Sequence, residues 1–169
     1  MLILGLGNLL MGDEGIGVHA VRALEKEPLP PGVTLLDGGT GGFHLLEVFD
    51  RHRHLILIDA TLDDGEPGTV SVLRPKFASD FPRSLSAHDI GLRDLVESAV
   101  LLGPLPTIDL ITVSIAKIQP MTMEMTPAVA HSIPRVTQTA RALLRDRLVA
   151  DALADAVLHA DHFILPHEE

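Results

Sequence analysis

The sequence predicts an α/β fold: one three-layer domain with a twisted, mostly parallel sheet of about five strands between helices. Three short apolar runs lack polar alternation, as strands do when both faces of a parallel sheet are buried. Patterns of helical spacing separate these runs, which is the arrangement of repeated βαβ units. The 169 residues, 46% of them hydrophobic, suffice for a single buried core.

The first half of the chain supplies three strands and two helices to this prediction. An apolar run at 1–4 feeds a glycine-rich loop, and a helix is then indicated by apolar residues at helical spacing, namely Ile16, Ala20, Val21 and Leu24. Residues 33–36 are expected to form the second strand and residues 43–49 a short helix. The continuous aliphatic run at 55–58 predicts the third strand.

Two further strands are expected in the second half. The run at 69–73 follows the third strand too closely for a helical crossover, which favours an antiparallel or edge strand. Residues 110–115 are the last clear strand. A helix over 88–102, capped by Ser86, is predicted from an apolar stripe made of Leu92, Leu95, Val96 and Ala99.

The C-terminal part of the chain is expected to be helical. Thr126-Pro127 is a helix start signal, and Pro134 should interrupt that helix, so the main helix is placed from Pro134 to Arg147. Its apolar stripe, expected to face inward, consists of Val136, Ala140, Leu143 and Leu144. We assign residues 1–147 to the α/β domain and residues 148–169 to an acidic tail that packs on it or trails it. This tail should hold one more helix, as far as about residue 159.

The composition disfavours several classes of function. A net charge of −10 argues against nucleic acid as a partner, because phosphate-binding surfaces need clustered lysine and arginine. The sequence contains no cysteine, which excludes disulfides, thiolate metal sites and cysteine nucleophiles. It shows no basic leader and no membrane-length apolar run, so we expect a cytoplasmic protein without a membrane partner. A monomer is favoured because no self-complementary apolar stripe is evident.

Few residues are placed to carry chemistry. The sequence lacks Gly-x-Ser-x-Gly, His-Glu-x-x-His and Asp-Thr-Gly, which are motifs of common hydrolases. Glu14 follows the first strand, Asp59 ends the third and His88 opens a helix, so the loops of an α/β sheet could bring all three to one crevice. Two oxygens and one imidazole nitrogen would suit a borderline divalent ion. Taken singly, such residues more commonly serve as caps, turn residues or surface groups.

The loop from Gly5 to Gly17 has the strand–loop–helix setting of a nucleotide-binding turn. It is not a dinucleotide fingerprint, because the third glycine would fall at Leu10, and it lacks the lysine of a phosphate loop. Asp37, in the simplest interpretation, forms an Asx turn. The methionines at 121–125 are either core filler or an adaptable contact surface. His19, His44, His52 and His54 show no ligand spacing and are expected to be exposed, and the tail histidines His159, His162 and His167 favour at most fortuitous metal binding at the surface.

Four separated motifs together resemble the hydrogenase maturation proteases, peptidase family M52. They are the loop Gly5-Leu-Gly-Asn-Leu-Leu-Met-Gly-Asp-Glu-Gly-Ile-Gly17, Asp37-Gly-Gly-Thr-Gly41, Ile58-Asp-Ala60 and Ser86-Ala-His88. The resemblance spans roughly residues 1–145. It implies an endopeptidase with a phosphorylase/hydrolase-like sheet, in agreement with the βαβ pattern.

The resemblance also implies a reaction. Members remove a C-terminal extension from the large-subunit precursor of a [NiFe] hydrogenase after nickel insertion. The nickel comes with the substrate, so no permanently bound cofactor is expected, and it would either orient the scissile peptide or polarise it and activate water. The family's nickel ligands fall on Glu14, Asp59 and His88, although Asp13 could compete with Glu14. The supporting loop residues would be Gly5, Gly7, Asn8, Asp13, Asp37, Gly38 and Gly41.

Two other functions stay open from the residues alone. A peptidyl-tRNA hydrolase-like esterase shares the Gly-Leu-Gly-Asn opening, but it would need a basic surface for RNA, which the net charge disfavours. A non-catalytic nucleotide-binding module would use the loop from Gly5 to Gly17, with Asp37 on a ribose.

Overall fold

Five strands form one sheet in the order β2-β1-β3-β5-β4 in the computed structural model, which describes residues 1–82 and 92–161. Four strands run parallel: β1 (Leu2–Leu6), β2 (Thr34–Gly39), β3 (His54–Thr61) and β5 (Thr107–Ser114). The edge strand β4 (Val70–Leu73) pairs antiparallel with β5. The predicted mostly parallel sheet with one antiparallel edge strand is therefore confirmed.

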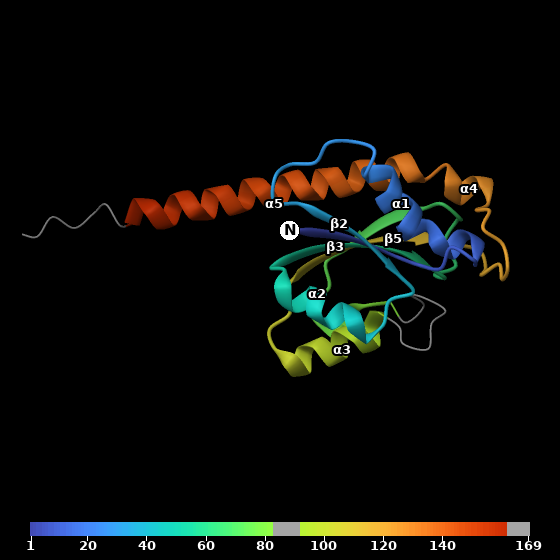
Figure 1. Ribbon diagram of the computed structural model, residues 1–169, viewed down its shortest axis with the longest axis horizontal. Helices are drawn as coiled ribbons and strands as arrows, with labels where there is room; N and C mark the ends of the chain where they lie inside the picture. Colours follow the sequence, from blue (N-terminus) through green and yellow to red (C-terminus); the bar gives the residue numbers. More distant parts are fainter. Residues whose placement is uncertain (83–91, 162–169) are drawn as a thin grey trace, which may run out of the picture.

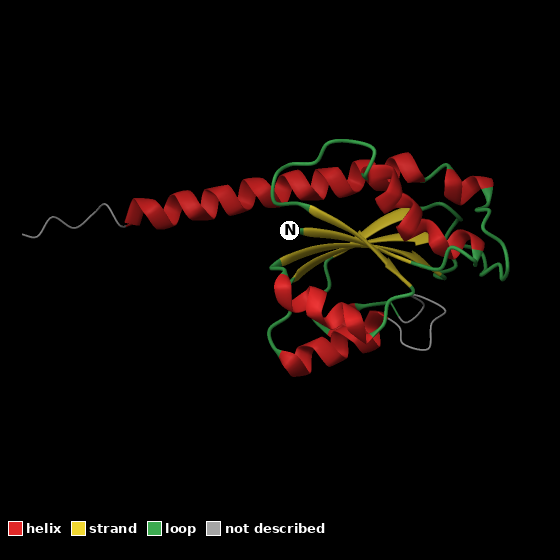
Figure 2. Ribbon diagram, in the orientation of Figure 1, coloured by secondary structure: helices red, strands yellow, loops and turns green. Residues whose placement is uncertain are grey.

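Helices cover both faces of this sheet (Figures 1 and 2). On one face lie α1 (Ile16–Leu24) and α5 (Ile133–Asp161), and on the other lie α2 (Leu46–Arg51) and α3 (Leu92–Leu102). The connections contain four shorter helical segments: η1 (Gly12–Gly15), η2 (Phe43–Leu45), η3 (Ala78–Asp80) and α4 (Pro127–Ala130). The three-layer arrangement follows from helices that each bury one apolar stripe.

The core is aliphatic and divided by the sheet into two clusters. The apolar stripes expected to face inward are buried. They consist of Leu92, Leu95, Val96 and Ala99 in α3 and of Val136, Ala140, Leu143 and Leu144 in α5. The central strands β1 and β3 are buried along almost their whole length. Strand β2 differs from the expectation of burial on both faces, because its position at the sheet edge leaves Leu35 and Leu36 only partly covered.

Helix α5 is one continuous helix from Ile133 to Asp161. Pro134 lies in its first turn, where no backbone N–H is needed, and so separates α5 from α4 as predicted. The expected division into a helix ending at Arg147 and a further tail helix is wrong. No glycine or proline occurs between residues 135 and 161, and the alanine-rich sequence continues the helix. Its C-terminal half extends past the end of the sheet where the N-terminus lies (Figure 1).

A buried carboxylate attaches this helix to the sheet. Asp109 of β5 is only 2% exposed and accepts hydrogen bonds from Arg147 of α5 and from Arg74, which follows β4. Each nitrogen–oxygen distance is 2.9 Å.

Among the helices of the described ranges, none is long and apolar enough to cross a membrane.

Candidate active site

The candidate site lies at the carboxyl edge of the sheet, where β1 and β3 end side by side. The two strands pair in parallel from Leu2 with Leu55 to Gly5 with Ile58. Asp59 follows directly in β3, and Glu14 lies in η1, the helical segment that follows the loop after β1. Both carboxylates are buried, with Glu14 1% and Asp59 0% exposed. The topology thus brings together two of the three residues proposed from the sequence.

Glycines allow η1 and α1 to lie so close to these strand ends. A Cβ atom at Gly17 would collide with the carbonyl oxygens of Leu6 and Ile58, so only glycine fits where α1 meets both strands. Gly7, with φ +133°, turns the chain out of β1 in a conformation that other residues rarely adopt. The first turn of α1 is therefore held against the sheet, and η1 lies over the ends of β1 and β3.

The Glu14 carboxylate closes the glycine-rich loop on itself. Its Oε2 atom accepts a hydrogen bond from the backbone N–H of Asn8, while the Asn8 side chain accepts one from the N–H of Leu10 at 2.9 Å. In a phosphate-binding loop, backbone N–H groups at this place point at an anion from outside. Here the anion belongs to the chain, which argues against the nucleotide-binding interpretation of the loop.

Asp59 has an unusual electrostatic environment. Its Oδ1 accepts a hydrogen bond from the N–H of Ala60 at 2.8 Å, whereas its buried Oδ2 has no hydrogen-bond partner within the described residues. Burial, assisted by the negative charge of Glu14, raises the pKa of Asp59 to about 8. The Asp59 carboxyl is therefore largely protonated at neutral pH. A positively charged partner, such as a metal ion, could bind to the Oδ2 atom.

Asp13, the immediate neighbour of Glu14, is occupied elsewhere. Its carboxylate accepts hydrogen bonds from the N–H and hydroxyl of Thr126 at 2.6 and 2.9 Å and from Nε2 of Gln119 at 3.0 Å. The Gln119 Oε1 atom in turn accepts from the Asp13 N–H at 3.0 Å. Asp13 thus fastens the loop after β5 to η1, and both of its oxygens are used. These contacts favour Glu14 over Asp13 as the ligand-bearing residue.

Comparison with known proteins identifies the family. A family model described as hydrogenase maturation protease matches residues 18–142. The chain belongs to the hydrogenase maturation protease family. This confirms the resemblance found in the sequence, and with it the function of a peptide-bond hydrolase that acts in hydrogenase maturation.

Individual relatives of this maturation protease span most of its length. The hydrogenase 2 maturation protease of Escherichia coli K12 is 35% identical over 163 residues, covering 94% of this chain and 98% of that protein. The hydrogenase expression/formation protein HupD of Rhizobium leguminosarum is 37% identical and covers 89% of this chain and 76% of its own length. The structure of the E. coli hydrogenase maturating endopeptidase HybD superimposes with a TM-score of 0.78 at 36% identity, covering 86% of this chain and 92% of that one.

The sequence also predicts the side chains of His88 and Asp37 at the site of the maturation protease. Ser86 and His88 lie outside the described residues, so the role of His88 stays a prediction. Asp37 accepts a hydrogen bond from the N–H of Gly39 at 3.0 Å, as in the expected Asx turn, and also pairs with Arg22 at 3.2 Å. Within residues 1–82 and 92–161, no three metal-binding side chains form a cluster.

The histidines of the described part only partly follow the expectation. His44 is exposed, as expected, whereas His19, His52 and His54 are partly buried and thus less exposed than expected. His54 lies 3.2 Å from Asp151, at the start of β3 and so at the opposite end of this strand from Asp59. Gln119 and Thr126 were not identified from the sequence, because their partner Asp13 precedes them by 106 and 113 residues.

Proposed function

We propose that this maturation protease recognises the nickel carried by its [NiFe] hydrogenase precursor through Glu14, Asp59 and His88. The observation that carries the proposal is the pair of buried carboxylates at the ends of β1 and β3. His88 enters through the family resemblance and through its sequence position, four residues before α3 begins. Two carboxylates and one imidazole leave a nickel ion with open positions that ligands of the precursor fill.

The electrostatics of the carboxylate pair explain how nickel in the substrate would be sensed. Two buried like charges repel each other, and in the free chain the proton on Asp59 removes one of them. A divalent cation neutralises both carboxylates and displaces that proton. A precursor without nickel offers no such compensation, so the site distinguishes loaded from unloaded substrate.

The same argument makes nickel a property of the substrate and not a resident cofactor. In the free chain the protonated Asp59 would have to lose its proton before binding a metal, which lowers the affinity near neutral pH. The remaining ligands and the positioning of the ion come from the folded precursor. We therefore assign the recognition of nickel to the complex of protease and precursor.

The test uses the single substitutions Glu14→Gln, Asp59→Asn and His88→Gln in the full chain. Each variant is mixed with nickel-loaded and with nickel-free precursor, and both trimming and binding are measured. We expect each variant to remain folded by circular dichroism, to lose trimming and to bind the two precursors equally. The exposed Glu66→Gln variant serves as the control and should behave as wild type. Wild-type trimming by Asp59→Asn, or an unchanged preference for loaded precursor, contradicts the proposal.

A further inference from the structure

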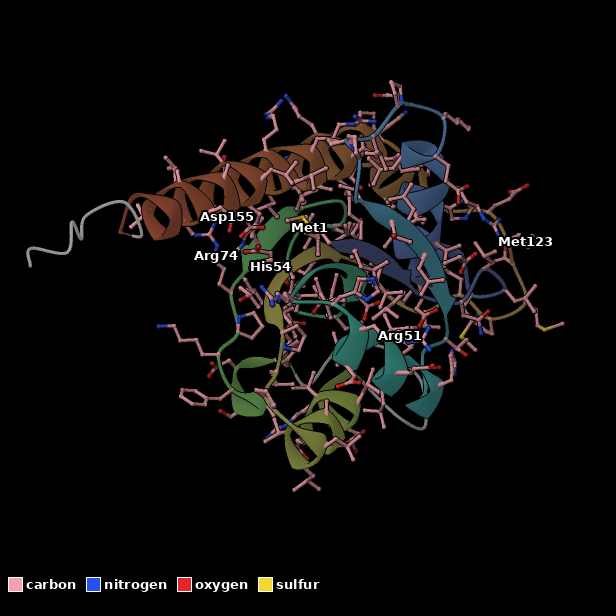
Figure 3. The ribbon with its side chains drawn as sticks, turned by 60° about the vertical axis from the view of Figure 1, so that its left-hand side comes forward. Met1, Arg51, His54, Arg74, Met123 and Asp155 are labelled. Carbon is pink, nitrogen blue, oxygen red and sulfur yellow. The ribbon has the colours of Figure 1, made fainter. Side chains whose placement is uncertain are left out.

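Three strongly exposed apolar side chains lie beside the carboxylate site. They are Leu10, Met121 and Met123, which are 56%, 91% and 62% exposed, and we call them the methionine rim. Leu10 belongs to the loop after β1, and the methionines belong to the loop after β5. In Figure 1 this second loop lies beside the start of α1, and Figure 3 shows Met123 at the outer edge of the molecule, away from the sheet.

The two loops of the rim are joined by backbone hydrogen bonds. The N–H of Thr122 donates to the carbonyl oxygen of Leu10 at 3.1 Å, and the N–H of Gly12 donates to the carbonyl oxygen of Thr122 at 2.8 Å. Met11 and Thr122 form a parallel β-bridge between these bonds. Thr122 thus holds Met121 and Met123 at a fixed place beside the loop that leads to Glu14.

Side-chain hydrogen bonds anchor the same loop from within. Gln119 and Thr126 bind the buried Asp13, so that the methionine segment between them is fastened on both sides. Asp13 adjoins Glu14 in the chain. The hydrogen bonds among Asp13, Gln119 and Thr126 therefore fix the position of the methionine rim relative to the Glu14 carboxylate.

The backbone at Met121 shows that the exposure of this side chain is maintained at a cost. Its φ angle is +61°, in the left-handed region that L residues with a Cβ atom adopt rarely. The same residue leaves 91% of an apolar side chain in water. Neither feature stabilises the free chain, so the conformation is expected to serve a contact made on binding.

We propose that the methionine rim binds apolar side chains of the large-subunit precursor next to the peptide bond that is cleaved. This inference rests on the proposed function. The occupant is the precursor because the rim continues the carboxylate edge that this substrate must reach. Thioether side chains are flexible and polarizable, which suits them to aliphatic or aromatic partners of varied shape. Met121 and Met123 are thereby residues that determine substrate affinity and not the chemistry of cleavage.

Steady-state trimming of nickel-loaded precursor tests this role. The double variant Met121→Ser/Met123→Ser should raise KM by about tenfold and leave kcat within about twofold, since the apolar contact is lost while Glu14 and Asp59 stay in place. The matched control Leu101→Ser/Leu102→Ser removes two equally exposed apolar side chains at the end of α3 and should leave both constants unchanged. Met121→Leu/Met123→Leu should restore the KM of the wild type.

A further variant separates the side chain from the backbone conformation. Met121→Gly relieves the left-handed strain, so it should raise Tm and still raise KM. An unchanged KM in the serine variant overturns the inference, and so does a loss confined to kcat. Failure of the nickel proposal gives a different result, because Glu14→Gln and Asp59→Asn would then trim normally while the serine variant still showed the raised KM.

Discussion

Asp109 on β5 and Arg147 on α5 form an ion pair that joins the long helix to the sheet, with 2.9 Å between the Arg147 Nε and the Asp109 Oδ2 atoms. The other oxygen of the carboxylate binds Arg74 at the same distance. Asp109 is 2% exposed, whereas the side chains of Arg74 and Arg147 are 66% and 26% exposed. One buried negative charge thus holds two cations, one from the segment after β4 and one from α5.

Replacing this carboxylate should destabilise the fold. Asp109→Asn leaves two guanidinium groups without their counter-charge, and we expect the free energy of unfolding to fall by about 2 kcal/mol. Urea denaturation measures the change. The control Glu97→Gln breaks the exposed pair with Arg93 within α3 and should cost less than about 0.5 kcal/mol. Equal effects of the two substitutions would show that Asp109 has no special role.

The stability of the free protease should depend on pH through Asp59. Its pKa lies near 8 in the folded chain and near 3.8 when unfolded, so the folded state binds more protons between these values and stability falls as pH rises between them. The Asp59→Asn variant should not lose stability in this way, because the amide does not titrate. Thermal unfolding should show the variant to be more stable than wild type by more than about 1 kcal/mol near pH 8, with little difference near pH 4. A difference independent of pH contradicts the buried, protonated carboxyl.

Formation of the productive complex should release the Asp59 proton. If nickel of the precursor takes its place, kcat/KM for loaded precursor should rise about tenfold per pH unit below the pKa and level off above about pH 8. Calorimetric titration in two buffers of different ionisation enthalpy measures the released proton directly. Near pH 7, the Asp59→Asn variant should release about one proton fewer than wild type. The same proton release from both proteins would disprove the exchange.

The close approach of α1 to the sheet can be tested by one methyl group. Gly17→Ala places a Cβ atom against the carbonyl oxygens of Leu6 and Ile58, which belong to backbone and cannot rotate away. We expect a loss of about 2–3 kcal/mol of stability and slower trimming, because η1 and Glu14 are displaced with α1. Gly103→Ala is the matched control, since a Cβ atom there meets nothing within 4 Å. A wild-type Tm for Gly17→Ala would refute this packing.

The assignment of residues 148–169 to a tail stays a prediction, and truncation examines it. Residues 149–157 are all exposed, and Asp151 among them pairs with His54. The free energy of unfolding of a chain that ends at Asp151 should therefore lie within about 0.5 kcal/mol of the value for the full chain. The truncated chain should also trim precursor at the same rate. Loss of the fold on truncation would place the α5 extension within the domain.

The sequence predicted those parts of the fold that local patterns determine. The buried runs of β1 and β3 and the stripes of α3 and α5 each need only a period of hydrophobicity, and all were located. The continuity of α5 differs from the expectation, although the sequence contains its signal. Residues 148–161 contain no glycine or proline that would end the helix. Asp109 was missed because the strand was expected to begin at Leu110, whereas β5 begins at Thr107.

The candidate site was predictable where topology alone decides it. Glu14 lies in the segment that follows β1, and Asp59 lies near the end of the adjacent parallel strand β3, so their meeting follows from the βαβ order. The anchoring of Asp13 by Gln119 and Thr126 was not predictable, since Asp13 lies more than a hundred positions before both residues and shares no periodic signal with them. The same holds for the exposure of Met121 and Met123, where a core position and a contact surface were equally compatible with the sequence. In the structure both side chains are exposed, so neither fills the core.

The hydrogen bond from the Asn8 amide to Glu14 has a consequence for inhibition. A loop that supplies its own anion repels phosphate, sulfate and nucleotides, so these ligands should neither bind nor slow trimming, even at millimolar concentration. Competitors of the site are expected among hard and borderline cations, and among compounds that present a chelated metal ion to two carboxylates. The choice of inhibitor class is thus set by a single intramolecular contact, formed before any substrate arrives.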